Sequence, residues 1–281
     1  MASSLIDVPV DGEHKPLTII TKMHVSQEEI VSNVRANIKR DVVRFLSLPL
    51  FLARNEPIAI CGGGPSLNIS VEKIKTFNQV MTCGSAHDHV VSLGITPTFA
   101  LAVDAMEDAV EYFQKPQEKT SYILASQCHP NMFEHLKDHK IAMWHFKGQC
   151  DDETIYNGEH QINWGCMVGV LSVQMALLLG FQHLHFFGFD CSYIDTDHHA
   201  YDVGEWHEKV ETQKGEFSVN GRKFNSTMAL VSQMEHLFDI FASPDGRMLK
   251  GYVHGDGIWA NTIAASPPEM KEWLEAPDVA A

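Results

Sequence analysis

The chain lacks the sequence signatures of several common protein classes. It has no stretch that approaches the roughly 18 consecutive apolar residues of a membrane-spanning helix. Its N-terminus lacks the charged start and the apolar run of a signal peptide, so we expect a cytoplasmic protein. Its 6 cysteines include no C-x-x-C pair, and several lie within apolar, strand-like runs. We therefore expect neither a disulfide nor a structural zinc site.

Positive charge is also scarce. The 21 lysines and arginines face 36 aspartates and glutamates, which gives a formal net charge of -15. Broad affinity for nucleic acid or anionic lipid requires a positive surface field, so we expect none, although a local basic groove is compatible with this balance. The hydrophobic fraction of 44% and the charged fraction of 20% are those of a globular protein with a packed core.

Familiar catalytic motifs are missing too. There is no G-x-S-x-G nucleophile elbow, and the 16 histidines include no H-E-x-x-H metal motif. The glycine-rich stretch at residues 61–67 is not a P-loop, because no Lys-Ser or Lys-Thr pair follows it, and it lacks the G-x-G-x-x-G spacing. Covalent catalysis is therefore unsupported by the sequence.

What the sequence does contain is an alternation of apolar runs and helical stretches. The runs are short and nearly continuous in apolar residues, which is typical of strands in a parallel sheet that is buried on both faces. We predict one main domain with an α/β fold, a Rossmann-like parallel sheet with helices on both faces. The predicted strands are residues 57–61, 79–83, 99–103, 121–125, 141–145 and 183–187, and an apolar helix spans residues 168–179.

Shorter segments flank this domain. Ser26 and Glu29 form a capping box, and the amphipathic helix that they begin is expected to run to about Leu48. A small C-terminal α+β extension is predicted, with a hairpin around residues 220–221, a helix at 227–241 and a strand at 248–253. We divide the chain into an N-terminal arm and helix (1–50), the Rossmann-type domain (51–260) and a C-terminal tail (261–281).

The first candidate site is the glycine-rich turn after the first core strand. Ligands of an open parallel sheet bind beyond the carboxyl ends of its strands. Glycine lets the backbone approach a ligand, and the following helix offers free N–H groups to a phosphate. A tight strand-to-helix turn without a ligand is the alternative interpretation. The residues of the turn are Gly62, Gly63, Gly64, Pro65 and Ser66.

Carboxylates and imidazoles follow other predicted strands. Asp104 and Asp190 each stand at a strand end, where a carboxylate holds a ribose hydroxyl or a divalent ion that bridges phosphates. Capping of the next helix or turn is the alternative role. His198 and His199 lie in a polar loop after Asp190, so one of them is a candidate general base unless the loop is merely solvated. Adjacent histidines point in different directions, so at most one is expected to be catalytic.

In order and spacing, these segments resemble the MptE-like family, which includes the bacterial motility accessory factors. The resemblance covers roughly residues 27–260 and rests on residues 62–67, 94–97, 103–104, 180–181, 187–193 and 199–201. The pattern from residue 168 to residue 190 is also similar to that of bacterial sialyltransferases, which use a CMP-sugar and a catalytic histidine.

This resemblance implies a transferase that acts on a nucleotide or nucleotide-sugar donor of the CMP-sugar or ATP type. One branch, archaeal MptE, moves pyrophosphate from ATP to 6-hydroxymethyl-dihydropterin with magnesium, and other branches are linked to nonulosonic-acid glycosylation. The donor-binding residues that it implies are those of the glycine-rich turn together with Gly84, Ser85, Gly169 and Tyr193.

We therefore predict glycosyl transfer from a nucleotide-activated sugar to an acceptor hydroxyl. His199 would act as the base, and Asp104 and Asp190 would order the donor or an ion. One alternative is ATP-dependent pyrophosphoryl transfer to a hydroxymethyl-pterin-like acceptor, in which the same two aspartates would hold Mg²⁺. Another is a nucleotide-binding protein without catalysis. The sequence leaves the acceptor, and association into a homo-oligomer, open.

Overall fold

The chain folds around one large parallel sheet. A computed structural model describes residues 3–10, 13–20, 25–147, 150, 152–162, 167–194, 197–202, 214–244 and 246–266. The sheet has nine strands in the order β13-β10-β4-β5-β6-β7-β8-β3, with β9 beside β8, and all of its pairings are parallel. Its strands are β3 (Val43–Arg44), β4 (Ile58–Cys61), β5 (Val80–Cys83), β6 (Phe99–Ala102), β7 (Ser121–Ala125), β8 (Lys140–Phe146), β9 (Gln161–Ile162), β10 (His183–Phe187) and β13 (Lys250–His254).

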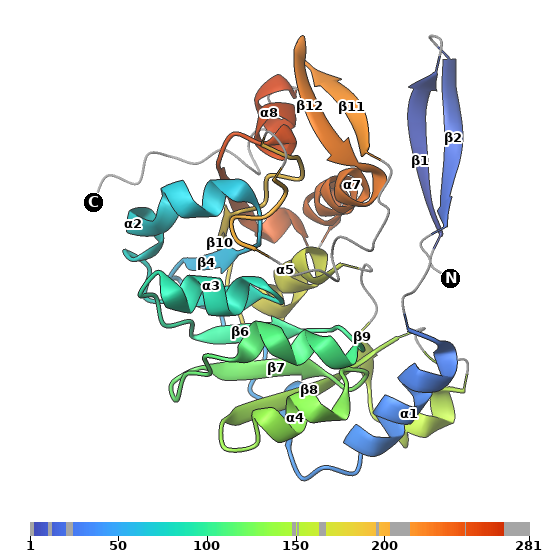
Figure 1. Cartoon of the computed structure of the whole chain (residues 1–281), viewed down its shortest axis with the longest axis vertical. Coiled ribbons are helices and arrows are strands. Elements are labelled where there is room, and N and C mark those ends of the chain that lie inside the picture. Colours follow the sequence, from blue (N-terminus) through green and yellow to red (C-terminus); the bar gives the residue numbers. More distant parts are fainter. Residues whose placement is uncertain are drawn as a thin grey trace.

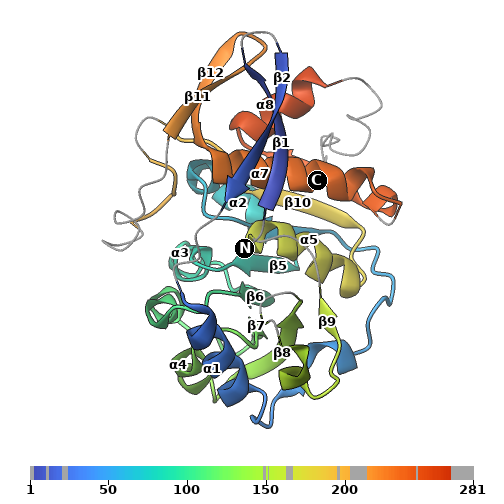
Figure 2. The ribbon, with the colours of Figure 1, turned by 90° about the vertical axis from the view of Figure 1, so that its right-hand side faces the viewer.

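Helices cover both faces of this sheet, which confirms the predicted Rossmann-like α/β fold. On one face, Ile74 and Val90 from α2 (Val71–Ile74) and α3 (Ala86–Ser92) pack with Ala59 and Val80 of the strands. The other face packs against α5 (Val168–Leu178) and α7 (Met228–Ala242). The strands β10, β5, β6, β7 and β8 follow one another down the molecule between these layers (Figure 2).

The direction of the chain across the sheet reverses next to β4. From β4 the chain adds β5, β6, β7 and β8 one after another on one side, and it then returns to place β10 on the other side of β4 (Figure 1). The loops after β4 and β10 therefore leave the sheet as neighbours at its carboxyl edge. This is the position at which open α/β sheets bind their ligands.

The N-terminal helix α1 (Gln27–Asn37) begins as predicted and ends earlier than predicted. Ser26 and Glu29 form the expected capping box. The prediction that the helix continues to about Leu48 is wrong, because Arg44 donates to the carbonyl oxygens of Ile38, Arg40 and Val42. These bonds satisfy carbonyls at the end of the helix and hold the chain in an irregular path into β3, which joins the main sheet beside β8.

The predicted C-terminal elements are present, and the structure contains a further helix that was not predicted. β11 (Lys214–Val219) and β12 (Arg222–Thr227) form the hairpin around residues 220–221. Thr227 caps α7, and β13 extends the main sheet. The missed helix α8 (Ile258–Ala265) runs across the expected boundary at residue 260 and buries Trp259 in the core.

The remaining elements are short or lie outside the main sheet. β1 (Ser3–Val10) and β2 (Glu13–Ile20) pair antiparallel with each other. Within the described residues no helix is long and apolar enough to cross a bilayer. Five cysteines are free and buried, whereas Cys166 lies outside the described residues. The other helices are η1 (Phe45–Ser47), η2 (Pro65–Ser70), η3 (Glu107–Phe113), α4 (Pro130–His135), η4 (Glu153–Tyr156) and η5 (Gly246–Met248).

Candidate active site at the carboxyl edge of the sheet

Two glycine-containing turns interlock after β4 and β10. A Cβ on Gly62 would lie 2.7 Å from the carbonyl oxygen of Gly188, and one on Gly188 would lie 2.6 Å from that of Gly62. Gly188 also has a φ of 67°, a left-handed conformation that favours glycine. The two turns can approach this closely only because both positions lack side chains. Protein packing thus explains Gly62 without a ligand.

The amides of the glycine-rich turn are largely engaged by protein acceptors. Gly62 donates to the carbonyl oxygen of Phe187, and Gly64 donates to that of Gly188, each at 2.8 Å. The N–H of Ser66, at the start of η2, donates to Asp190 Oδ2 at 2.9 Å. Asp190 therefore occupies the helix N-terminus at which a phosphate was expected, and the turn presents fewer amides to a ligand than its sequence suggests.

Asp190 is sealed beneath the turn. Only 3% of the residue is exposed, and burial raises the pKa of its carboxyl group while the N–H of Ser66 opposes that rise. A Cβ on Gly255 would lie 2.5 Å from Ser66 Oγ and 3.1 Å from Asp190 Oδ1, so the loop after β13 closes over both groups. Gly257 packs just as closely on the main chain of Asp190. This carboxylate joins three loops of the carboxyl edge.

A segment that we name the strap, residues 197–202, crosses above the glycine-rich turn. The N–H of Ala200 donates to the carbonyl oxygen of Gly63 at 2.9 Å. A Cβ on Gly63 would lie 2.7 Å from His199 Cδ2 and 2.6 Å from the hydroxyl of Tyr201. Gly63 and His199, two predicted site residues, thus lie side by side, and Tyr201 lies next to them.

The strap also reaches the end of β5. Tyr201 and Ser85 share a hydrogen bond of 2.8 Å between their hydroxyl oxygens. Burial raises the pKa of the Tyr201 hydroxyl, and its bond to Ser85 opposes the rise. Gly84 has a φ of 50°, and a Cβ there would meet only Val168 Cγ1, at 3.8 Å. The start of α5 and the end of β5 therefore lie beside the strap.

The two adjacent histidines of the strap do not point apart as expected, because their ring centroids lie 4.2 Å from each other, but each ring also has a neighbour of its own. His199 lies over Gly63, whereas the ring of His198 lies 5.0 Å from that of Tyr193. Lys214 Nζ stands 4.3 Å from the Tyr193 ring, and burial and then this lysine lower the pKa of His198. Tyr193 is nearly buried and is tied to β12 by its N–H. Tyr193 thus joins the group around His199 through the ring of His198, which contacts both residues.

Asp104 lies at the same edge as Asp190 but follows a different strand. It follows β6, and β6 and β10 stand three strand spacings, about 14 Å, apart in the sheet. Asp104 is exposed and lies near Tyr112. Burial raises the pKa of Tyr112, and Asp104 and Tyr201 add to this rise. Asp104 and Tyr201 of the strap therefore both act on the hydroxyl of Tyr112.

The predicted donor residue Gly169 fills a packing role. A Cβ there would lie 2.9 Å from Gln233 Oε1 and 3.0 Å from the ring of Phe189, so glycine permits the close contact of α5 with α7. Pro65 is the first residue of η2. Neither position takes part in the group around His199.

Two polar residues near the strap were not predicted. Asn68 Nδ2 donates to the carbonyl oxygen of Ala200 at 2.8 Å, and Asn68 Oδ1 lies 2.7 Å from His89 Nε2. The ring of His89 lies 4.8 Å from that of Tyr201. In sequence, both residues look like solvated positions on helices, and only the crossing of the strap gives them partners.

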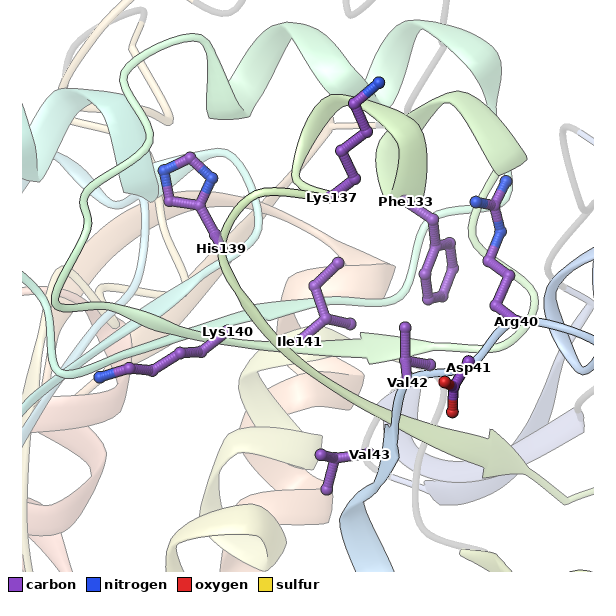
Figure 3. A pocket seen from close by; sticks show the side chains of 9 residues that line it. All are labelled: Arg40, Asp41, Val42, Val43, Phe133, Lys137, His139, Lys140 and Ile141. Carbon is purple, nitrogen blue, oxygen red and sulfur yellow. The ribbon is translucent and has the colours of Figure 1, made fainter.

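A surface hollow lies at the opposite edge of the sheet. Its volume is about 520 Å³, and it lies at the start of β8 and before β3, where Arg40, Lys137 and Lys140 surround apolar side chains (Figure 3). Arg40 and Lys137 both pair with Glu134, at 3.8 and 2.6 Å, so two of these cations are already compensated. This hollow is separated from the predicted site by the length of the strands.

Comparison with known proteins identifies one family. A family model described as 6-hydroxymethylpterin diphosphokinase MptE-like matches residues 28–196, more than half of the chain. No curated protein matches the chain significantly.

A solved glycosyltransferase shares the fold. The MAf glycosyltransferase from Magnetospirillum magneticum AMB-1 has a TM-score of 0.61 and 18% identity, with 83% of this chain covered. The match covers 37% of that glycosyltransferase, so this chain corresponds to only part of it. The sialyltransferase CstII from Campylobacter jejuni, solved with cytidine-5'-monophosphate, gives a TM-score of 0.40 and 15% identity over 76% of this chain and 86% of that one. A mammalian sialyltransferase has a TM-score of 0.39 and 15% identity, over 66% of this chain and 72% of that one.

Proposed function

The chain belongs to the MptE-like family, and from this premise we propose that it is a nucleotide-dependent transferase. In this proposal, a sugar moves from a nucleotide-activated donor to a hydroxyl group of an acceptor. The observation that carries it is the contact of His199 with Gly63 at the carboxyl edge of β4. An imidazole held above the turn nearest to the topological switch point is placed where a bound donor would react.

The donor would bind between the glycine-rich turn, the end of β5 and the start of α5. Gly63 is the residue of the turn whose amide has no protein acceptor within the described part of the chain, so it can face an anionic group. Gly84 leaves room beside Val168, and the Ser85 hydroxyl can exchange its bond with Tyr201 for a bond to a ribose or a base. This arrangement suits a CMP-sugar or a related nucleotide donor.

His199 would take the proton from the acceptor hydroxyl as the new glycosidic bond forms. A neutral imidazole nitrogen accepts that proton, and the departing nucleotide leaves with the electrons of its bond to the sugar. Base catalysis of this kind contributes roughly 10²- to 10⁴-fold to a rate. His198 would contribute little, because its ring lies against Tyr193.

Pyrophosphoryl transfer from ATP, the alternative that the family description suggests, depends on magnesium. The two aspartates expected to hold Mg²⁺ follow strands that lie three strand spacings, about 14 Å, apart in the sheet. Asp190 already accepts a hydrogen bond from Ser66 and is buried, and no group of three metal-ligating side chains occurs in the described part of the chain. These residues do not fit a shared Mg²⁺ site, so the geometry favours glycosyl transfer.

A matched pair of histidine variants tests the proposal. Purified protein is offered CMP-, UDP- and GDP-sugars with simple hydroxyl acceptors, and separately ATP with Mg²⁺ and a hydroxymethyl-pterin. We expect transfer from one nucleotide-sugar, a kcat lowered about 10²- to 10⁴-fold in His199→Gln, and nearly full activity in His198→Gln.

Other results would redirect the assignment. Pyrophosphoryl transfer that survives His199→Gln would favour the diphosphokinase. Nucleotide binding without turnover of any donor would favour a binding protein. Equal losses in both histidine variants would contradict the role of His199.

A further inference from the structure

One amide side chain joins the strap to the helices beneath it. Asn68 lies in η2, directly after the glycine-rich turn. Its Nδ2 donates to the carbonyl oxygen of Ala200 at 2.8 Å, and its Oδ1 lies 2.7 Å from His89 Nε2. Asn68 thereby connects the residue that follows His199 to α3.

The two ends of this amide cannot be exchanged. The carbonyl oxygen of Ala200 can only accept a hydrogen bond, so the nitrogen of Asn68 must face it. The oxygen of Asn68 then faces His89, which must carry its proton on Nε2. An oxygen in place of the nitrogen would repel the Ala200 carbonyl, so a carboxylate of the same shape cannot replace this amide.

Both main-chain polar groups of Ala200 form hydrogen bonds. Its N–H donates to the carbonyl oxygen of Gly63 at 2.9 Å, and its carbonyl oxygen accepts from Asn68. His199 immediately precedes Ala200, and its ring lies over Gly63. Loss of the Asn68 bond would leave the main chain of Ala200 with its bond to Gly63 and without a donor for its carbonyl oxygen.

We propose that Asn68 is a positioning residue that keeps the imidazole of His199 above Gly63. This inference rests on the proposed function, since it concerns the orientation of the general base. A misplacement of about 1 Å in a reacting group can cost roughly 10²-fold in rate. Asn68 does not itself touch the reacting atoms, so its effect falls on kcat and not on donor binding.

The test compares Asn68→Asp and Asn68→Ala with Ile69→Ala. Ile69 is the next residue of η2 and is 82% exposed, so its variant controls for a surface substitution in the same turn. We expect both Asn68 variants to lower kcat for sugar transfer about 10- to 100-fold, with the donor KM within about threefold of the wild type. In the His199→Gln background, Asn68→Asp should lower kcat less than twofold further, because the base that it positions is gone.

A second readout does not depend on catalysis. Hydrogen exchange of the amides at residues 197–202 should be about tenfold faster in Asn68→Asp and unchanged in Ile69→Ala. If the wild type transfers no sugar and exchange still rises, the proposed function fails while the anchoring of the strap stands. The inference would be overturned if exchange at residues 197–202 were unchanged in Asn68→Asp. It would also be overturned if Asn68→Asp lowered kcat as much in the His199→Gln background as in the wild type.

Discussion

At the scale of single residues, the role of each site residue depends on its contacts in the fold and not on its position in the sequence. His198 and His199 are adjacent, but one lies against Tyr193 and the other over Gly63. Asp190, at a strand end that invited a ligand role, instead joins the turns after β4, β10 and β13 through the N–H of Ser66. Because Asp190 is buried, the free energy of unfolding should depend on pH in a way that can be measured.

The pH dependence of unfolding should report the burial of Asp190. The native pKa of this group is raised above its ordinary value of 3.8, so the native state binds the proton more tightly than the unfolded state. Its contribution to stability is fully present below about pH 3.8 and is lost as pH rises through the native pKa. Asp190→Asn keeps the shape and an acceptor for Ser66 but cannot titrate.

Urea unfolding at a series of pH values checks this prediction. The free energy of unfolding of the wild type minus that of Asp190→Asn should fall as pH rises from 3.8. The subtraction removes other carboxylates such as Glu159, whose pKa is lowered and whose contribution has the opposite sign. A difference that stays constant or rises with pH would show that Asp190 is not destabilised by burial in its charged form.

At the scale of elements, α1 belongs structurally to the carboxyl edge of the sheet. Asn33 donates to the carbonyl oxygens of Ala105 and Gln127, and Asn37 donates to those of Ser126 and Cys128. Both asparagines are buried, and they are four residues apart on one face of the helix. The helix therefore fixes the loops after β6 and β7, including the loop that carries Asp104.

The stability lost when one of these asparagine side chains is removed should show how strongly α1 holds the two loops. Asn37→Ala leaves two buried carbonyl oxygens without their donor, at about 1–3 kcal/mol each, so we expect a loss of about 2–4 kcal/mol in the free energy of unfolding. Ser32→Ala, on the exposed side of the same helix, should change it by less than about 0.5 kcal/mol. Denaturant unfolding of both variants measures these changes. If Asn37→Ala had the same free energy of unfolding as Ser32→Ala, the role of α1 would be contradicted.

At the scale of the whole molecule, the sequence predicted the sheet well because its signals are local. Continuous apolar runs mark β4, β5, β6, β7, β8 and β10, and their order along the chain places residues 62–66, 84–85, 104 and 190 at one edge. Contacts between distant segments were not predictable. α8 closes over the core beyond the expected boundary, and Asp190 takes the amide that a phosphate was expected to use. The role of Asn68 likewise depends on a strap more than 100 residues away. The early end of α1 has a local cause that the helical spacing of apolar residues did not reveal, since Arg44 donates to carbonyls two to six residues before it.

The proposed function requires a nucleotide to bind beneath the strap at the carboxyl edge of β4 and β5. Hydrogen exchange of the full chain, with and without CMP, UDP, GDP or ATP with Mg²⁺, shows whether one does. We predict that one of these ligands slows exchange at residues 61–67, 84–86 and 197–202 and leaves the hollow near residues 40–43 and 137–141 unchanged. Protection of that hollow alone, or no protection by any ligand at millimolar concentration, would contradict the proposed function.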